Sequence, residues 1–185
     1  DETIGADSAV NTAMDAIDKI RDTATSMERI FVVEVMGRDS GYICLQVALG
    51  SGSEEALVPE REFDFHAMCH EIVEGNIRGK ISWIIIVAEG AGSAEDIAGR
   101  ITEMTDLETR VVVLGHVQRG GSPSARDRIL ATRMGAEAVN LLLQGHTGKA
   151  VGVVSDSLSE VDMEKAVSKK EFKTAGLYGL LKLLT

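Results

Sequence analysis

Apolar residues follow two alternating patterns along the chain, short continuous runs and longer stretches with helical spacing. Runs rich in Val, Ile and Leu predict strands at 30–35, 55–58, 83–88, 110–114 and 150–155. Apolar positions three or four apart predict helices at 8–24, 42–49, 63–79 and 122–143, a further helix that begins at residue 93, and helix over most of 163–184. The acidic segment 157–164 is predicted to be the solvated start of a helix. Strands that are apolar on both faces and alternate with helices predict a doubly wound α/β fold, mostly parallel, with helices on both faces.

Polar residues gather where three of these strands end. MGR follows IFVVEV, EGAGS follows WIIIVA, and GHVQRGGSP follows RVVVL. In parallel sheets, ligands bind beyond the carboxyl ends of the strands. The pattern therefore predicts one crevice to which all three turns contribute.

The turn GHVQRGGSP has the composition of an anion site. Its glycines permit close backbone approach, and Ser122 is placed to cap a helix whose N-terminal amides favour anions. Arg119 offers a rigid fork of donors that suits a phosphate, and His116 can add another donor. Spacing alone leaves open an ordinary loop with a capping serine and a surface arginine.

The other two turns add one cation and one carboxylate. Arg38 could face charge that develops on a transferred phosphoryl group, or pair with Asp39 at the surface. Glu89 could accept hydrogen bonds from sugar hydroxyls, or be an ordinary loop acid. No metal site is expected, because the histidines spaced four apart within 63–79 lack further ligands.

Composition narrows the class of partner. The 185 residues carry a net charge of −10, which argues against nucleic acid or an anionic membrane surface but not against a small anion. No apolar run approaches the ~20 residues of a membrane span. Cys44 and Cys69 lack CxxC spacing, which favours reduced thiols and a cytoplasmic location. The start at Asp1, without Met, predicts a processed or truncated product.

Taken together, RIFVVEVMGRDSG, VAEG and LGHVQRGGSPSARDRILATRMGAEAV resemble the 6-phosphofructokinases in order and separation, and the resemblance extends over essentially the whole chain. The family's glycine-rich GGDGS-like nucleotide loop and its TIDND-like segment with the catalytic aspartate do not occur here. The resemblance implies the half that binds fructose 6-phosphate, inactive alone. It assigns 1–116 and 163–185 to a sugar-phosphate-binding domain and 117–162 to a segment that packs on a nucleotide-binding domain.

The resemblance also implies roles for individual residues. His116 and Arg119 would hold the 6-phosphate, and Glu89 the sugar hydroxyls. Arg38 would be catalytic, because it would stabilise the phosphoryl group in transfer. The remaining substrate-binding positions are Met36 and Gly37, which line the sugar site, and Arg29 and Arg110, which reach the 6-phosphate of a neighbouring subunit. Sites shared in this way imply a homotetramer.

A second, regulatory site follows from the same resemblance. ADP or phosphoenolpyruvate would bind there as effector, through Arg21, Gly52, Glu54, Arg78 and Lys80. Mg²⁺ and ATP would be the cofactors of the complete enzyme, held mostly by the half that is absent. In the family an aspartate of that half deprotonates the sugar 1-hydroxyl. Two alternatives stay open: a pyrophosphate-dependent phosphofructokinase, and a non-catalytic regulatory half that binds a sugar phosphate.

Overall fold

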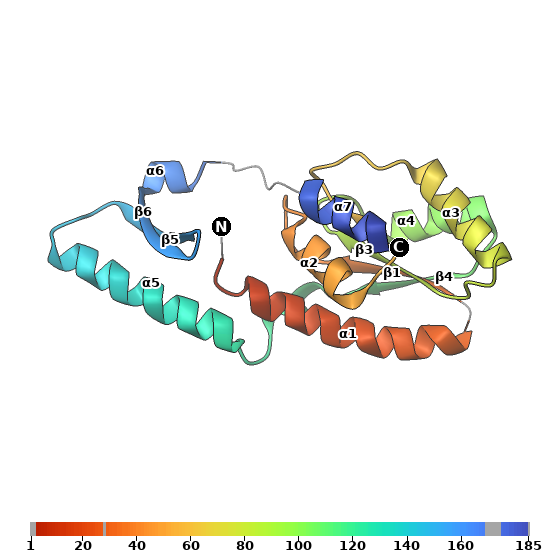
Figure 1. Ribbon diagram of the computed structural model, residues 1–185, viewed down its shortest axis with the longest axis horizontal. Helices are drawn as coiled ribbons and strands as arrows, with labels where there is room; N and C mark the ends of the chain where they lie inside the picture. Colours follow the sequence, from red (N-terminus) through yellow and green to blue (C-terminus); the bar gives the residue numbers. More distant parts are fainter. Residues whose placement is uncertain (1–2, 28, 169–174, 185) are drawn as a thin grey trace. The chain divides into compact units, whose positions relative to one another are not determined.

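The computed structural model describes residues 3–27, 29–168 and 175–184. The chain divides into two compact units (Figure 1). The larger consists of Val10–Gly120 with Phe172–Thr185, and the smaller of Asp1–Ala9 with Gly121–Glu171. Among the helices in these described ranges, none has both the length and the apolar character needed to cross a bilayer.

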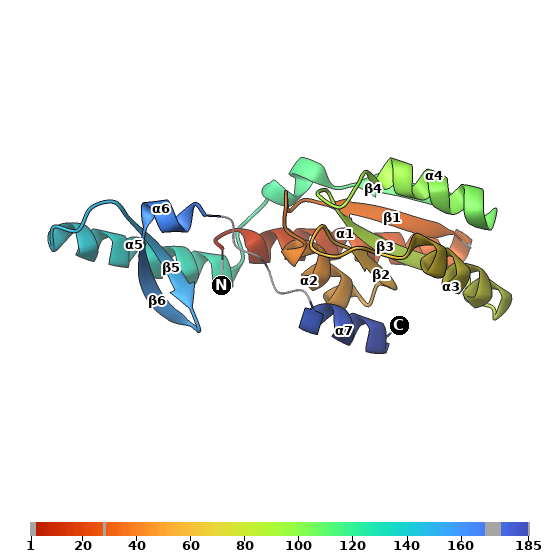
Figure 2. The same ribbon diagram turned by 90° about the horizontal axis from the view of Figure 1, so that it is seen from above.

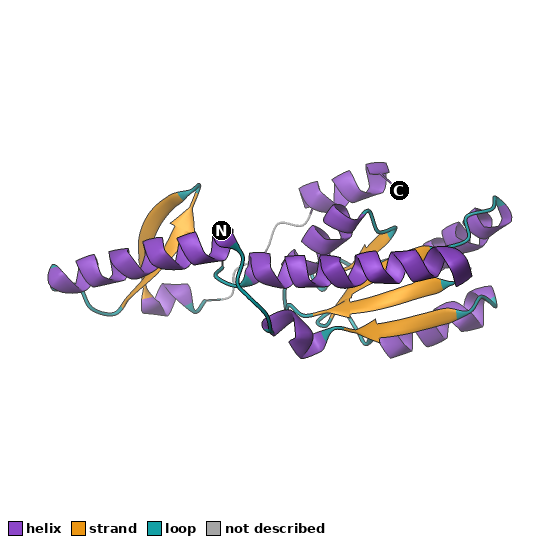
Figure 3. Cartoon of the chain, turned by 90° about the horizontal axis from the view of Figure 1, so that it is seen from below, coloured by secondary structure: helices purple, strands orange, loops and turns teal. Residues whose placement is uncertain are grey.

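A four-stranded parallel sheet forms the centre of the larger unit (Figure 3). Its order is β2-β3-β1-β4, and every neighbouring pair is parallel. The strands are β1 (Ile30–Val35), β2 (Glu55–Leu57), β3 (Trp83–Ala88) and β4 (Thr109–Val113). Each parallel neighbour requires a crossover helix, so this arrangement confirms the predicted doubly wound fold.

Helices cover both faces of this sheet, as Figure 2 shows. Alternate residues of β1 point to opposite faces, so Val33 packs with one layer and Val32 with the other. The layer against Val33 contains α1 (Ala6–Met27), α2 (Tyr42–Ser51) and α7 (Ala175–Leu184). The layer against Val32 contains α3 (Phe65–Ile77) and α4 (Ala94–Thr105), the latter capped by Ser93 as predicted. Burial on both faces explains why the strands read as continuous apolar runs.

The turn after β4 differs from the prediction. A 3₁₀ helix, η1 (Gly115–Arg119), follows the strand directly, and α5 (Ala125–Leu143) begins later than expected. Ser124 caps α5, because its side-chain oxygen accepts from the Asp127 N–H at 3.2 Å. The prediction that Ser122 caps this helix was therefore wrong, since η1 and the GGSP segment move the helix start toward the second serine.

The smaller unit contains a hairpin where a parallel strand and a helix were predicted. β5 (Lys149–Val154) pairs antiparallel with β6 (Ser157–Asp162) and does not join the parallel sheet. Ser155 and Asp156 connect the strands with φ of 49° and 63°, the left-handed pair of a tight hairpin turn. The acidic segment 157–164 is thus mainly strand. The helix predicted over 163–184 is reduced to α6 (Met163–Ala166) and α7, with 169–174 outside the described residues.

A buried carboxylate joins the starts of α1 and α5 within the smaller unit. Asp127 is 2% exposed and accepts from Gly5 N at 2.8 Å, Ser8 N at 2.8 Å and Ser8 Oγ at 2.6 Å. Ser8 Oγ in turn accepts from Ser124 N at 2.9 Å. Burial opposes ionisation, but the hydrogen bonds from Ser8 and Gly5 outweigh it and lower the pKa of Asp127. An ionised aspartate in the first turn of α5 therefore satisfies amides at the start of α1.

Candidate functional site

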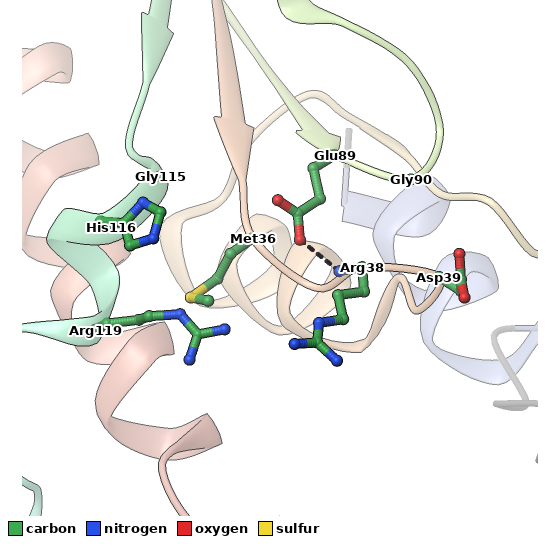
Figure 4. Close-up of a pocket in the computed structure, with 8 residues that line it drawn as sticks. All are labelled: Met36, Arg38, Asp39, Glu89, Gly90, Gly115, His116 and Arg119. Atoms are coloured by element: carbon green, nitrogen blue, oxygen red, sulfur yellow. Dashed lines mark hydrogen bonds between the residues drawn. The ribbon is translucent and has the colours of Figure 1, made fainter.

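The three polar turns meet at one cavity of about 520 Å³ in the larger unit. The turns follow β1, β3 and β4, so the cavity lies at the carboxyl ends of adjacent parallel strands, as the crevice was predicted to lie. Figure 4 shows the residues that line it. They are Met36, Arg38, Asp39, Glu89, Gly90, Gly115, His116 and Arg119.

Side chains from the other two turns hold the backbone of the turn after β1. Met36 N donates to Gln118 Oε1 at 2.8 Å. Gly37 N and Arg38 N both donate to Glu89 Oε1, at 2.9 and 2.6 Å. Arg38 has a φ of 52°, a left-handed conformation that costs on the order of 1–3 kcal/mol and persists only where the surroundings enforce it. These three hydrogen bonds enforce it.

Glu89 is the carboxylate of the cavity. Hydrogen bonds from Gly37 N and Arg38 N lower its pKa; partial burial opposes them, and the charges of Arg119 and Arg38 assist them. Glu89 is therefore ionised at neutral pH. Its Oε1 holds the turn, and among the described residues no hydrogen bond to its Oε2 is found. Glu89 can thus support the turn and still accept from a ligand hydroxyl.

The cations of the cavity come from two different turns. Figure 4 shows the guanidinium groups of Arg38 and Arg119 pointing toward one another, with His116 beside Arg119. Asp39 points away from Arg38, and in the described structure no ion pair joins these two residues. Two guanidinium groups and an imidazole around one cavity offer hydrogen-bond donors of the kind that suit an anion such as phosphate.

Gly90 is required where the turn after β3 passes under the turn after β1. A Cβ atom on Gly90 would lie well inside van der Waals contact with the carbonyl oxygen of Arg38. The Cβ position is fixed by the backbone and its neighbour is a backbone oxygen, so the clash cannot be relieved by a rotamer change.

We expect Gly90→Ala to displace the turn that carries Arg38 and to lower the melting temperature by several degrees, corresponding to roughly 1–3 kcal/mol. Thermal unfolding followed by circular dichroism measures this. Gly99→Ala is the matched control, because Gly99 lies in α4 with open space around its Cα and alanine is the better helix former. A Gly90→Ala protein as stable as the control would contradict the tight approach.

Two predicted substrate residues lie away from this cavity. Arg29 precedes β1, and Arg110 lies at the start of β4, at the end of the sheet opposite the cavity. Arg29 Nε donates to Glu108 Oε2 at 2.8 Å, and Arg110 pairs with the other oxygen of Glu108. Within one chain they do not contribute to the cavity that holds Arg119. Their role toward a neighbouring subunit stays a prediction.

The five residues predicted to bind an effector are near the amino ends of the strands. Arg21 donates to the carbonyl oxygens of Ser51 and Gly52, at 2.8 and 3.1 Å. Lys80 pairs with Glu54 at 3.3 Å. Arg78 pairs with Glu74 and, with Lys80, lines a cavity of about 370 Å³ that Arg21, Gly52 and Glu54 do not line. The structure thus brings them together in part, and effector binding stays a prediction.

The donor set of the main cavity does not fit a divalent metal. Its charged side chains are mainly cationic, whereas Mg²⁺ is held by carboxylate and carbonyl oxygens and by water. Across the described residues, no group of three or more His, Cys, Asp or Glu side chains is arranged to hold a metal ion. These residues therefore suit the phosphate of a ligand rather than its metal.

Comparison with known proteins decides the family. Residues 1–142 match the family model described as phosphofructokinase. The chain belongs to the phosphofructokinase family. It is 52% identical over 185 residues to the ATP-dependent 6-phosphofructokinases of Bacillus cytotoxicus and Bacillus thuringiensis. The whole chain is covered in both cases, and it spans 58% of each relative's length.

Solved phosphofructokinase structures share the fold. The structure of phosphofructokinase from Saccharomyces cerevisiae matches with a TM-score of 0.84 and 33% identity, over all of this chain and 25% of that one. A pyrophosphate-dependent phosphofructokinase from Marinobacter aquaeolei matches with a TM-score of 0.75 and 22% identity, over 92% of this chain and 48% of that one. The second likeness shows the fold alone.

Proposed function

We propose that this chain is the substrate-binding portion of a 6-phosphofructokinase, which transfers a phosphoryl group from ATP to the 1-hydroxyl of fructose 6-phosphate in glycolysis. The observation that carries the proposal is the cavity where Arg38, His116 and Arg119 surround an anion site beside the ionised Glu89. A sugar phosphate has one anionic end and several hydroxyls, and this cavity offers donors for the first and an acceptor for the second. Relatives at 52% identity named ATP-dependent 6-phosphofructokinases support the choice of reaction.

The proposed roles follow from the chemistry of each side chain. His116 and Arg119 hold the 6-phosphate, Arg119 through its planar fork of donors. Glu89 accepts from sugar hydroxyls through Oε2. Arg38, on a different turn, faces the phosphoryl group as negative charge develops on it in the transition state. Met36 and Gly37 line the sugar. These residues bind, orient and stabilise charge, which accounts for most of the catalysis that phosphoryl transfer requires.

ATP, with Mg²⁺, is the proposed phosphoryl donor. The relatives at 52% identity are named ATP-dependent, whereas the pyrophosphate-dependent structure is only 22% identical. Neither ATP nor Mg²⁺ is assigned to residues of this chain. Two reduced thiols, Cys44 and Cys69, are both buried and unpaired, which supports a cytoplasmic location for the proposed enzyme.

Assembly is the other part of the proposal. Residues 117–162 pack on a nucleotide-binding domain. Large apolar side chains of α5 support this packing, because they are exposed to solvent in the described part of the chain. Their exposed fractions are 60% for Ile129, 56% for Val139, 65% for Leu142 and 82% for Leu143. Arg29 and Arg110 supply phosphate ligands to a neighbouring subunit of a homotetramer, and ADP or phosphoenolpyruvate binds near Arg78 and Lys80.

Isothermal titration of the chain with fructose 6-phosphate tests the proposal. We expect fructose not to bind measurably, because the charged contacts dominate affinity, and fructose 6-phosphate to bind at least about tenfold more tightly than inorganic phosphate, because its hydroxyls add contacts to Glu89. Circular dichroism confirms that the protein is folded. Equal binding of fructose and fructose 6-phosphate, or of neither, by folded protein would contradict the proposed substrate.

A further inference from the structure

Gln118 is a buried polar side chain in an otherwise exposed turn. It is 2% exposed, whereas the adjacent Val117 is 66% exposed, and His116 and Arg119 are also exposed. Burying an amide costs free energy unless it is hydrogen-bonded. Its Oε1 accepts from the backbone N–H of Met36 at 2.8 Å, across to a turn 82 residues away in sequence. The interaction therefore links two separate strand ends.

This link completes a set of three consecutive backbone hydrogen bonds. The amide of Met36 donates to Gln118, and those of Gly37 and Arg38 donate to Glu89. The turn after β1 is thus held on one side by the turn after β4 and on the other by the turn after β3. Without Gln118, one end of the turn would lose its connection while Arg38 keeps a left-handed φ of 52°.

The position of Gln118 gives this contact a functional consequence. Gln118 directly precedes Arg119 in η1, and Met36 lies two residues before Arg38. A second contact, from Leu114 N to Glu34 O at 3.1 Å, fixes the start of the same turn against β1. The backbone segments that present the two guanidinium groups are therefore connected through one buried amide, and their separation is set before any ligand binds.

We propose that Gln118 is a positioning residue that holds the Met36–Arg38 turn in register with Arg119, so that both arginines meet one sugar phosphate. The inference rests on the proposed function. Gln118 does not contact the substrate, and it acts through the Met36 amide. Preorganisation of this kind lowers the cost of binding because the two cationic groups do not have to be ordered by the ligand.

The test compares Gln118→Met with the wild-type chain. Methionine has similar length and volume but offers no comparable acceptor to Met36 N. We expect hydrogen exchange of the Met36 amide, followed by NMR, to accelerate about tenfold, and fructose 6-phosphate to bind about tenfold more weakly. Binding of inorganic phosphate should change less than about twofold, since Arg119 and His116 remain. Val117→Ala, an exposed position in the same 3₁₀ helix, is the matched control.

Gln118→Glu separates hydrogen bonding from packing. Its carboxylate keeps an acceptor for Met36 N, so Met36 exchange should stay near the wild-type rate. Its charge would repel phosphate, so this variant is assessed by exchange alone. Two results would overturn the inference: Met36 exchange in Gln118→Glu as fast as in Gln118→Met, or unchanged Met36 exchange and affinity in Gln118→Met. In either case, binding of fructose 6-phosphate by the wild-type chain would still uphold the proposed function. Failure of the wild-type chain to bind fructose 6-phosphate overturns both.

Discussion

Arg119→Ala is expected to weaken fructose 6-phosphate binding by about 100-fold or more, because the variant loses the two charge-assisted hydrogen bonds that we propose Arg119 donates to the phosphate. The side chain is exposed at the cavity and has no ion-pair partner among the described residues, so its donors are available to a ligand. The same exposure predicts little change in folding stability. Isothermal titration gives the affinity, and thermal unfolding shows whether the variant stays folded.

Two further variants show whether the geometry of the guanidinium matters. Arg119→Lys retains the charge but not the planar fork, and we expect an intermediate loss of about tenfold. Arg128→Ala removes the same charge from α5, where Arg128 Nε donates to the Pro123 carbonyl, and should leave the affinity nearly unchanged. If Arg119→Ala behaves like Arg128→Ala, the anion site has been assigned to the wrong residue.

The position of the site could be predicted from the sequence because it depends on a local rule. IFVVEV, WIIIVA and RVVVL are apolar at nearly every position, so they predict a buried parallel sheet, and polar turns directly after them must meet at one edge. Turn chemistry was harder to predict. Ser122 and Ser124 are separated by a single proline, and the sequence does not show that η1 precedes them or that Ser124 caps α5.

The contacts that hold the site together could not be predicted, since they join segments far apart in the sequence. Nothing in GHVQRGGSP distinguishes Gln118, which is buried, from Val117, which is exposed. Likewise, Glu89 reads as a ligand-binding acid, whereas in the structure one of its oxygens is occupied by the amides of Gly37 and Arg38. The hairpin of β5 and β6 was missed for a different reason, because SDSLSEVD has few apolar residues to reveal a strand.

Asp127→Ala is expected to destabilise the fold by about 3 kcal/mol or more, because it removes a buried, charged acceptor of three hydrogen bonds from part-buried donors. Gly5 N, Ser8 N and Ser8 Oγ all donate to this carboxylate, which is 2% exposed. No ligand contact is involved, so the loss should appear in urea or thermal unfolding. Hydrogen exchange at the amides of Gly5 and Ser8 should accelerate with it.

The pH dependence follows from the lowered pKa of Asp127, in which the hydrogen bonds from Ser8 and Gly5 outweigh burial. A carboxylate with a lower pKa in the folded state stabilises the fold above the unfolded-state pKa, near 4, and loses that contribution as the pH falls through the folded-state pKa. The difference in stability between wild type and Asp127→Asn should therefore be largest at neutral pH and shrink in strong acid. Asp156→Asn, which alters only an exposed pair with Arg133, should show no such trend. A difference that is independent of pH would mean that the shape of Asp127, and not its charge, joins the two helix starts.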